Sequence, residues 1–155
     1  MPLTQFEGES ALMATCCDLL EEIADDLPQA TLPVWREALQ LSMTVMPRHL
    51  DAVIHGLIPA LMQRARGDAL CEALLSQLKA DYEETFAHLP ELLDLLEHVL
   101  SAAHPKVSAD ALGFALRSFF EAIRRQMSWE NEVLIPLATR RLTETDRQSL
   151  LRALA

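Results

Sequence analysis

Apolar residues recur every three to four positions along most of the chain, which is the period of an amphipathic α-helix. The first such run extends from Ser10 to Asp26 and ends before Pro28, which a helix seldom continues into. The second run begins near Thr31, a favourable N-cap, and continues to Arg66–Gly67. The apolar face of the first helix is predicted to carry Leu12, Cys16, Leu19, Leu20, Ile23 and Leu27.

The second half of the chain shows the same alternation of long helices and short connections. Asp68 is expected to cap a third helix that continues to about Ala103, and Ser108 a fourth that ends near Pro136. The prolines inside these runs, such as Pro59 in the second, are expected to bend them. Four long amphipathic helices with short connections are typical of an antiparallel up-down four-helix bundle.

A short final helix follows, capped by Thr143 or Thr145. Half of the residues are hydrophobic and only 4 are glycine, which agrees with an all-α protein. We therefore predict one four-helix-bundle domain over residues 1–155 with a short extra C-terminal helix. No signal peptide and no run of apolar residues of membrane-spanning length is found.

An internal repeat relates the second and fourth helices at an offset of 77 residues. Both copies end in the triplet Leu-Ile-Pro. Ten residues before each proline stand His49 in the first copy and Gln126 in the second, and six before it stand Val53 and Glu130. When the two copies are superposed, the histidine of the first and the glutamate of the second together give the pattern His-x-x-x-Glu. Residues four apart share one face of a helix. Two such residues are suited to bind one metal ion from the bundle interior.

Antiparallel helices joined by a tight turn place residues equidistant from that turn at the same level. This rule brings His49 to the level of Asp81 and Glu84 on the third helix, and these to the level of Gln126 and Glu130 on the fourth. The sequence therefore predicts one layer of polar side chains across the middle of the bundle, with the surface as the alternative position for Glu84.

The first helix reaches the same level near Met13, with Cys16 and Cys17 about one turn away. Adjacent residues point about 100° apart on a helix, so we expect that these two cysteines do not both face the core squarely. The third cysteine, Cys71, makes the number odd and gives no disulfide framework. Reduced thiols in a cytoplasmic protein are the simplest interpretation.

The run from Phe119 to Ala138, followed by Leu142–Asp146, resembles the last metal-binding helix of the bacterial hemerythrin-like (HHE cation-binding) family. The stretch Cys17–Pro28 resembles the first helix of some bacterial members. The resemblance implies a four-helix bundle that holds two non-haem irons through histidines and carboxylates from all four helices. It also implies a role in carrying or sensing dioxygen, in responding to nitric oxide or peroxide, or in repairing iron centres.

The family pattern is only partly present. His49 and Glu130 match a histidine and a glutamate of the pattern, whereas Val53 and Gln126 replace their partners, and Asp81 stands where a histidine is usual. The remaining oxygen-rich set suits Mg, Mn or Ca better than tightly bound iron. The predicted metal ligands are His49, Asp81, Glu84 and Glu130, and the residues predicted to support them are Gln126, Asn131 and Cys17.

Charge restricts the partners, since a formal net charge of -10 disfavours nucleic acid and anionic membranes. Two functions stay open, and neither is an enzyme. An oxidase-like enzyme is a weaker third alternative, because one histidine makes a poor redox di-iron site. The first is a hemerythrin-like cation-binding protein for gas or redox sensing or metal handling, with weakly held iron or another divalent metal and a small gas ligand on that metal. The second is a metal-free helical bundle without a cofactor, acting as a regulatory or protein-interaction module with a homodimer or a protein partner.

Overall fold

The computed structural model describes residues 2–28, 32–101 and 108–154, and all regular secondary structure in these ranges is helical. The all-α class predicted from the sequence is therefore confirmed. The long helices are α1 (Pro2–Asp26), α2 (Leu32–Ala52), α4 (Ala69–Ser101) and α5 (Ala109–Trp129). The shorter ones are η1 (Val53–Leu57), α3 (Ile58–Arg64), η2 (Glu130–Leu134), α6 (Ile135–Arg141) and α7 (Glu144–Leu154).

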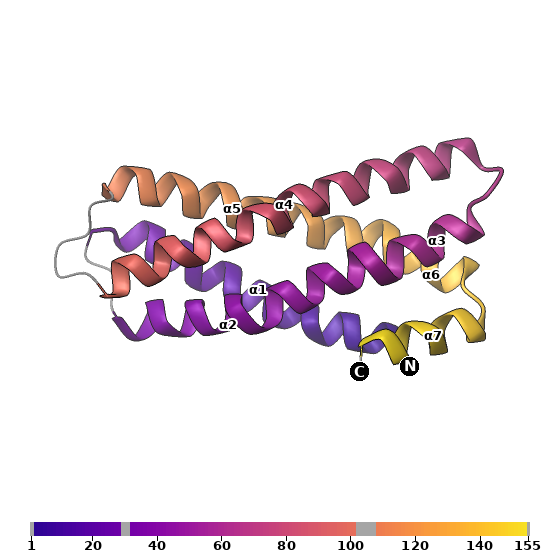
Figure 1. The fold of residues 1–155 in the computed structure, drawn as a ribbon, viewed down its shortest axis with the longest axis horizontal. Coiled ribbons are helices and arrows are strands. Elements are labelled where there is room, and N and C mark those ends of the chain that lie inside the picture. The colour runs from indigo at the N-terminus through magenta and orange to yellow at the C-terminus, as the bar shows by residue number, and fades with distance from the viewer. Residues whose placement is uncertain (1, 29–31, 102–107, 155) are drawn as a thin grey trace.

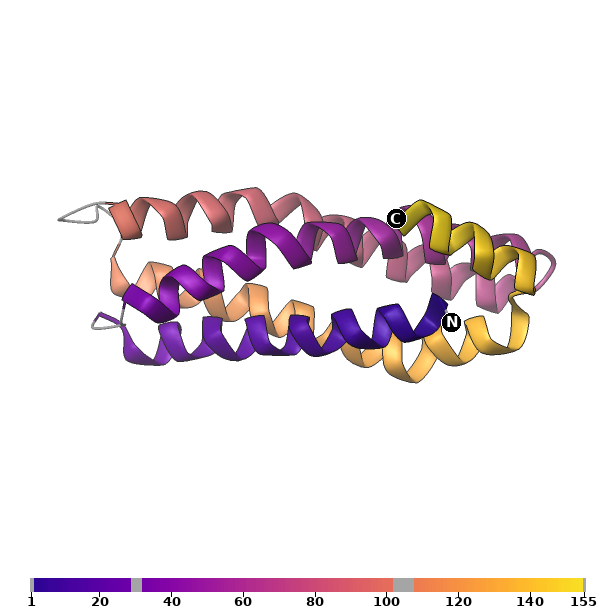
Figure 2. The ribbon, with the colours of Figure 1, turned by 90° about the horizontal axis from the view of Figure 1, so that it is seen from below.

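The long helices lie side by side along the long axis of the molecule (Figures 1 and 2). α1 packs against both α2 and α5, and α2 packs against α4. η1 and α3 continue α2 without a break in the chain, and η2 and α6 continue α5 in the same way. The buried apolar side chains form one continuous core between these segments. In the described ranges, no helix is long and apolar enough to cross a membrane.

Three of the predicted helix caps are confirmed by their hydrogen bonds. The side-chain oxygens of Asp68, Ser108 and Thr143 each accept a bond from the backbone N–H three residues later, at 3.1, 3.1 and 3.2 Å. These bonds satisfy N–H groups that a helix leaves without an internal partner. Thr31, the remaining predicted cap, and the turn predicted after Ala103 lie outside the described residues.

Each copy of the internal repeat contains a π-helical segment at the same place. η1 begins at Val53 and η2 at Glu130, which are equivalent positions of the repeat. The residue before each proline, Pro59 or Pro136, donates its N–H to the carbonyl five residues back rather than four. A proline ring clashes with the carbonyl four residues earlier, and the wider π turn relieves that clash. Pro59 therefore widens the helix, where the sequence predicted only a bend.

α7 folds back onto η1 and α1. Gly56 in η1 makes this approach possible, because a Cβ atom at this position would lie 3.2 Å from Leu150 Cδ2 of α7. The first turn of α1 and the last turn of α7 come to a similar level along the long axis of the molecule as a result (Figures 1 and 2). The glycine and the leucine thus determine where the C-terminal helix rests.

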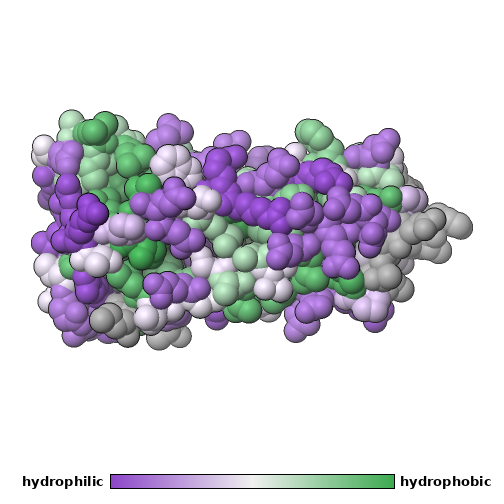
Figure 3. Space-filling view, turned by 180° about the vertical axis from the view of Figure 1, so that it is seen from behind, coloured by the Kyte–Doolittle hydropathy of each residue, from purple (hydrophilic) through white to green (hydrophobic). Residues whose placement is uncertain are grey.

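Ion pairs connect α1 to α5. The face opposite to that of Figure 1 carries a band of hydrophilic residues (Figure 3). Arg124 lies 2.8 Å from Asp18 and 2.6 Å from Glu21, and Arg117 lies 2.7 Å from Asp25. Pairs as exposed as these contribute little to stability, about 0–1 kcal/mol each. Their main effect is to favour one register of α1 along α5.

The first helix differs from the prediction in its start and in its buried face. α1 begins at Pro2 rather than at Ser10, and Leu12 is 42% exposed, whereas Met13 is 1% exposed and belongs to the core. Cys16 and Cys17 are both fully buried, although adjacent positions on a helix point about 100° apart. The reason is that α1 is covered on two sides, by α2 next to Cys16 and by α5 next to Cys17.

The register of α1 predicts unequal losses of stability for truncations at two adjacent positions. Met13→Ala removes a buried side chain and should lower the free energy of unfolding by about 2–5 kcal/mol. Leu12→Ala should change it by less than about 1 kcal/mol, because the side chain is partly in water already. Urea denaturation followed by circular dichroism measures both. Equal losses, or the reverse order, would contradict the register of α1.

Candidate functional site

A buried histidine between two carboxylates lies where α1, α2 and η2 meet. His49 Nε2 lies 2.8 and 3.0 Å from the two carboxylate oxygens of Glu130, and His49 Nδ1 lies 3.2 Å from Glu9 Oε2. The histidine is fully buried, and the two glutamates are 2% and 5% exposed. We refer to Glu9, His49 and Glu130 as the ion triad.

The surroundings of the triad hold the imidazole in place. The ring of Phe6 packs edge-on against it, with the ring centroids 6.0 Å apart and an interplanar angle of 71°. On the other side of Glu9, the half-exposed guanidinium of Arg48 lies 3.1 Å from Glu9 Oε1. A second positive charge therefore stabilises the carboxylate that is nearer to the surface.

The geometry favours a doubly protonated His49, because each ring nitrogen faces an acceptor. Burial by itself lowers the pKa of His49. The hydrogen bonds to Glu130 and Glu9 and the charges of both carboxylates outweigh this and raise the pKa to about 9. The hydrogen bond from His49 lowers the pKa of Glu9, against the opposing effect of burial. At neutral pH the triad is thus an imidazolium between two carboxylates.

A second polar group adjoins the triad and connects α5 to α4. Gln126 Nε2 donates to Thr85 Oγ1 at 2.6 Å and to Asp81 Oδ2 at 3.2 Å. The hydroxyl of Tyr82 donates to the backbone oxygen of Gln126 at 3.1 Å. Burial and the negative charge of Glu130 raise the pKa of Tyr82, so it stays a neutral hydrogen-bond donor. The side-chain oxygen of Gln126 is buried and has no hydrogen-bond partner.

The structure brings together only part of the predicted site. His49 and Glu130 are in direct contact, and Asp81 reaches Gln126 but is half-buried and paired at 3.2 Å with Arg125 on the surface side. Glu84 is exposed, so the surface position left open for it is the one observed.

The two other residues predicted to support the site lie elsewhere. Asn131 is exposed on η2. The thiol of Cys17 donates to the backbone oxygen of Phe120, 3.8 Å away, and burial raises its pKa to about 12. Cys16 lies next to Ser42, and burial raises its pKa to about 11. Both thiols therefore stay protonated and pack as small apolar side chains.

Sequence reasoning missed Glu9 because it placed the helix start at Ser10. The signal that could have found it is helical spacing, since Glu9 follows Phe6 by three residues and precedes Met13 by four. Both neighbours are buried, so an α1 that began earlier puts a glutamate on its apolar face. Such a residue needs a partner, and His49 of α2 is at the same level.

The residues around the triad do not fit the di-iron centre that the family resemblance implies. The other described histidines, His55, His88 and His98, are exposed on the surface. Val53, at the position equivalent to Glu130, is fully buried among apolar side chains. Over residues 2–28, 32–101 and 108–154, no group of three or more His, Cys, Asp or Glu side chains is placed to hold a metal ion. Glu9 and Glu130 face opposite ring nitrogens, so they do not converge on one ion.

Comparisons with protein-family models, with curated proteins and with solved structures find no significant match to this chain. The functional interpretation therefore depends on the residues of the site itself.

The ion triad predicts a characteristic dependence of stability on pH. The pKa of His49 is about 9 in the folded protein and about 6.5 when unfolded, so its contribution is complete below pH 6.5 and lost as the pH rises through 9. The free energy of unfolding should fall by up to about 3 kcal/mol over this range. Urea denaturation at several pH values measures it. The His49→Gln variant should lack this slope, and a wild-type curve as flat as that of the variant would contradict a buried imidazolium.

Removing Glu130 should leave the buried Nε2–H of His49 without an acceptor and the imidazolium with Glu9 as its remaining partner in the triad. Glu130→Ala is expected to lower the free energy of unfolding by about 3–5 kcal/mol at pH 7. Glu132→Ala, two residues further on the exposed side of η2, is the matched control and should have an effect within about 0.5 kcal/mol. Thermal unfolding of both variants tests this, and similar melting temperatures would show that the triad does not stabilise the fold.

Proposed function

We propose that this protein is a metal-independent helical interaction module, in which a buried imidazolium replaces the metal ion of a hemerythrin-like bundle. In this proposal the four long helical segments form an antiparallel up-down bundle. The observation that carries the proposal is that both ring nitrogens of His49 are engaged by buried carboxylates. The positive charge that the two carboxylates require is thus already provided by a proton.

The side chains at neighbouring positions support this interpretation. Val53 is apolar and buried where the second half of the repeat has Glu130, and Met13 and Met46 fill the adjoining core. Gln126 is engaged with Thr85 and the half-buried Asp81 on α4. A bundle that no longer binds metal needs core side chains of this kind to fill the space of the missing ligands.

A role in binding other molecules is supported by an apolar groove between α4 and α5. Its volume is about 610 Å³, within the range of binding sites for small molecules and side-chain anchors. An exposed apolar patch of this kind on a soluble protein commonly marks an interaction site. The cytoplasm is the proposed location, since the cysteines at positions 16, 17 and 71 are all free thiols.

A second candidate function is the hemerythrin-like binding of a single cation. It is favoured by the side-chain oxygen of Gln126, which is buried without a hydrogen-bond partner. It is also favoured by the hydrogen bond between Glu9 and Nδ1 of His49. In metal sites a carboxylate bound to one ring nitrogen of a histidine commonly orients the other nitrogen toward the metal. Sensing a small gas ligand would belong to this candidate, since the gas would bind to the metal.

Metal content and chelator sensitivity distinguish the two candidates. The protein, with Glu130→Ala and His49→Ala variants, is loaded with Fe(II) without oxygen, desalted and analysed by mass spectrometry. We expect no retained metal and the same melting temperature with and without EDTA. Metal retained near one equivalent by the wild type and lost by both variants would overturn the proposal in favour of cation binding.

A further inference from the structure

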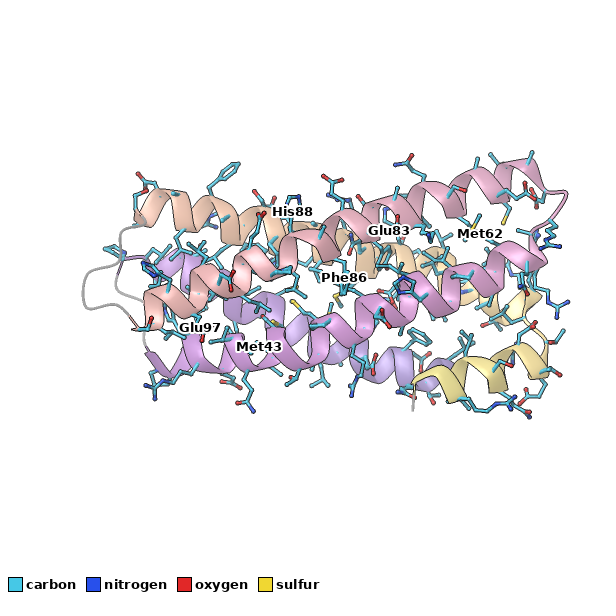
Figure 4. All side chains as sticks on the ribbon, viewed as in Figure 1. Met43, Met62, Glu83, Phe86, His88 and Glu97 are labelled. Carbon is cyan, nitrogen blue, oxygen red and sulfur yellow. The ribbon has the colours of Figure 1, made fainter. Side chains whose placement is uncertain are left out.

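The groove between α4 and α5 is apolar at its base and acidic at its rim. Leu92, Leu95 and Phe119 contribute its apolar surface, together with Phe114, which is 76% exposed. His88 marks its edge on α4, near the place where α4 crosses α5 (Figure 4). Phe86 points to the other side of the same helix (Figure 4), so the groove is separate from the packing of α4 on α2.

Small side chains explain why the two helices leave a groove here. α5 presents Ala115, Ser118 and Ala122 to this side, and none of them is long enough to reach α4 fully. α5 packs more closely against α1 than against α4. The large side chain of Phe114 stands beside these small residues and remains mostly in water. An aromatic ring in this position is available as an anchor for a partner.

The charge of the groove indicates the sign of the partner. Asp81, Glu84 and Glu91 line it. The basic side chains there are Arg125, which is paired with Asp81, and His88, whose Nδ1 lies 3.6 Å from Glu91 Oε2. Glu84 has no ion-pair partner in the described part of the chain. The formal net charge of the whole chain is -10. A cationic partner is therefore attracted to this face, and an acidic one is repelled.

The dimensions of the groove indicate the shape of the partner. It extends from Asp81 to Leu95 along α4 and from Phe114 to Arg125 along α5, which corresponds to about 16–21 Å of helix. That length corresponds to roughly three to four turns of a third helix lying between α4 and α5. Helices commonly bind such grooves through apolar residues at positions i, i+3, i+4 and i+7.

We propose that this groove is the docking site for a basic amphipathic helix of a partner protein. The inference rests on the proposed interaction module and names its partner. Apolar side chains of the incoming helix pack against Phe114, Leu92 and Leu95, and lysines or arginines on its flanks pair with Glu84 and Glu91. A second copy of this acidic chain is a less suitable occupant, because the like charges of two copies repel.

The probe for the test is a fluorescent peptide of about 16 residues made of leucine and lysine, with the leucines at helical spacing. A second peptide has the same composition with the leucines scrambled, and a third has glutamate in place of lysine. Binding to the full chain is measured by fluorescence anisotropy with EDTA present. We expect only the amphipathic lysine peptide to bind, and its affinity to fall as salt is raised. Equal binding of the scrambled peptide would overturn the proposal.

Groove variants locate the binding. Phe114→Lys should weaken the affinity by about tenfold or more, because it removes the aromatic anchor and adds a repelling charge. Glu84→Gln combined with Glu91→Gln should weaken it several-fold and reduce its salt dependence. The matched control is Leu70→Ala, an exposed apolar residue on α4 outside the groove, which should bind as the wild type does. All three substituted groove positions are exposed, so the variants should fold, as circular dichroism will show.

The outcomes separate this inference from the proposed function. An unchanged affinity of Phe114→Lys places the peptide elsewhere and overturns the docking site, whether or not the ion triad is metal-free. A dimer of the wild type in analytical ultracentrifugation that Phe114→Lys abolishes assigns the groove to a second copy and likewise overturns the proposal. Metal retention by the wild type overturns the proposed function alone, since peptide binding is measured in chelator.

Discussion

An imidazolium held between two carboxylates, with all three groups at most 5% exposed, is the constraint on which the rest of the structure depends. Burying such charges is unfavourable unless each finds its partner at hydrogen-bond distance. Glu9, His49 and Glu130 come from three helical segments that are far apart in the sequence. Sliding any of these segments by one turn would leave a buried charge unpaired. The triad therefore selects one register of α1, α2 and η2 among many that apolar packing alone would tolerate.

The polar layer continues beyond the triad to the fourth long segment. Gln126 lies one turn before Glu130 and binds Asp81 and Thr85 of α4, while Tyr82 bonds back to the Gln126 backbone. All four long segments thus contribute to one layer, and the apolar core lies to both sides of it along the molecule. Apolar groups pack in many ways, whereas hydrogen bonds require particular partners. The layer gives the helices specificity and the core gives them stability.

The local parts of the fold could be predicted from the sequence. Asp68, Ser108 and Thr143 cap helices because their short side chains place an oxygen within reach of a backbone N–H that the helix leaves unpaired. The contact between His49 and Glu130 agrees with the internal repeat and with the rule of equal distance from a turn. Both signals depend on spacing along the chain, and spacing is a property of the sequence.

The parts that could not be predicted depend on which side of a helix is covered. Glu84 and Asp81 stand three residues apart on α4, yet only Asp81 reaches the interior layer, because Arg125 and Gln126 of α5 lie next to it. Periodicity gives the level of a side chain but fixes its direction only when one face is clearly apolar. α1 has two covered sides, so the apolar pattern there is wide and conceals Glu9 among buried residues.

The π segments have a geometric consequence for everything that follows them. One additional residue per turn advances the angular phase of a helix by about 100° relative to an uninterrupted α-helix. α3 and α6 are both advanced in this way, at matching points of the two halves, so they stay in phase with each other. Deleting a single residue from η1 would rotate Gly56 or its neighbours away from Leu150. The surface on which α7 packs would then be lost. Pro59 and Pro136 thus keep the helical phases of α3 and α6 matched, so that the two halves of the chain present corresponding faces to each other.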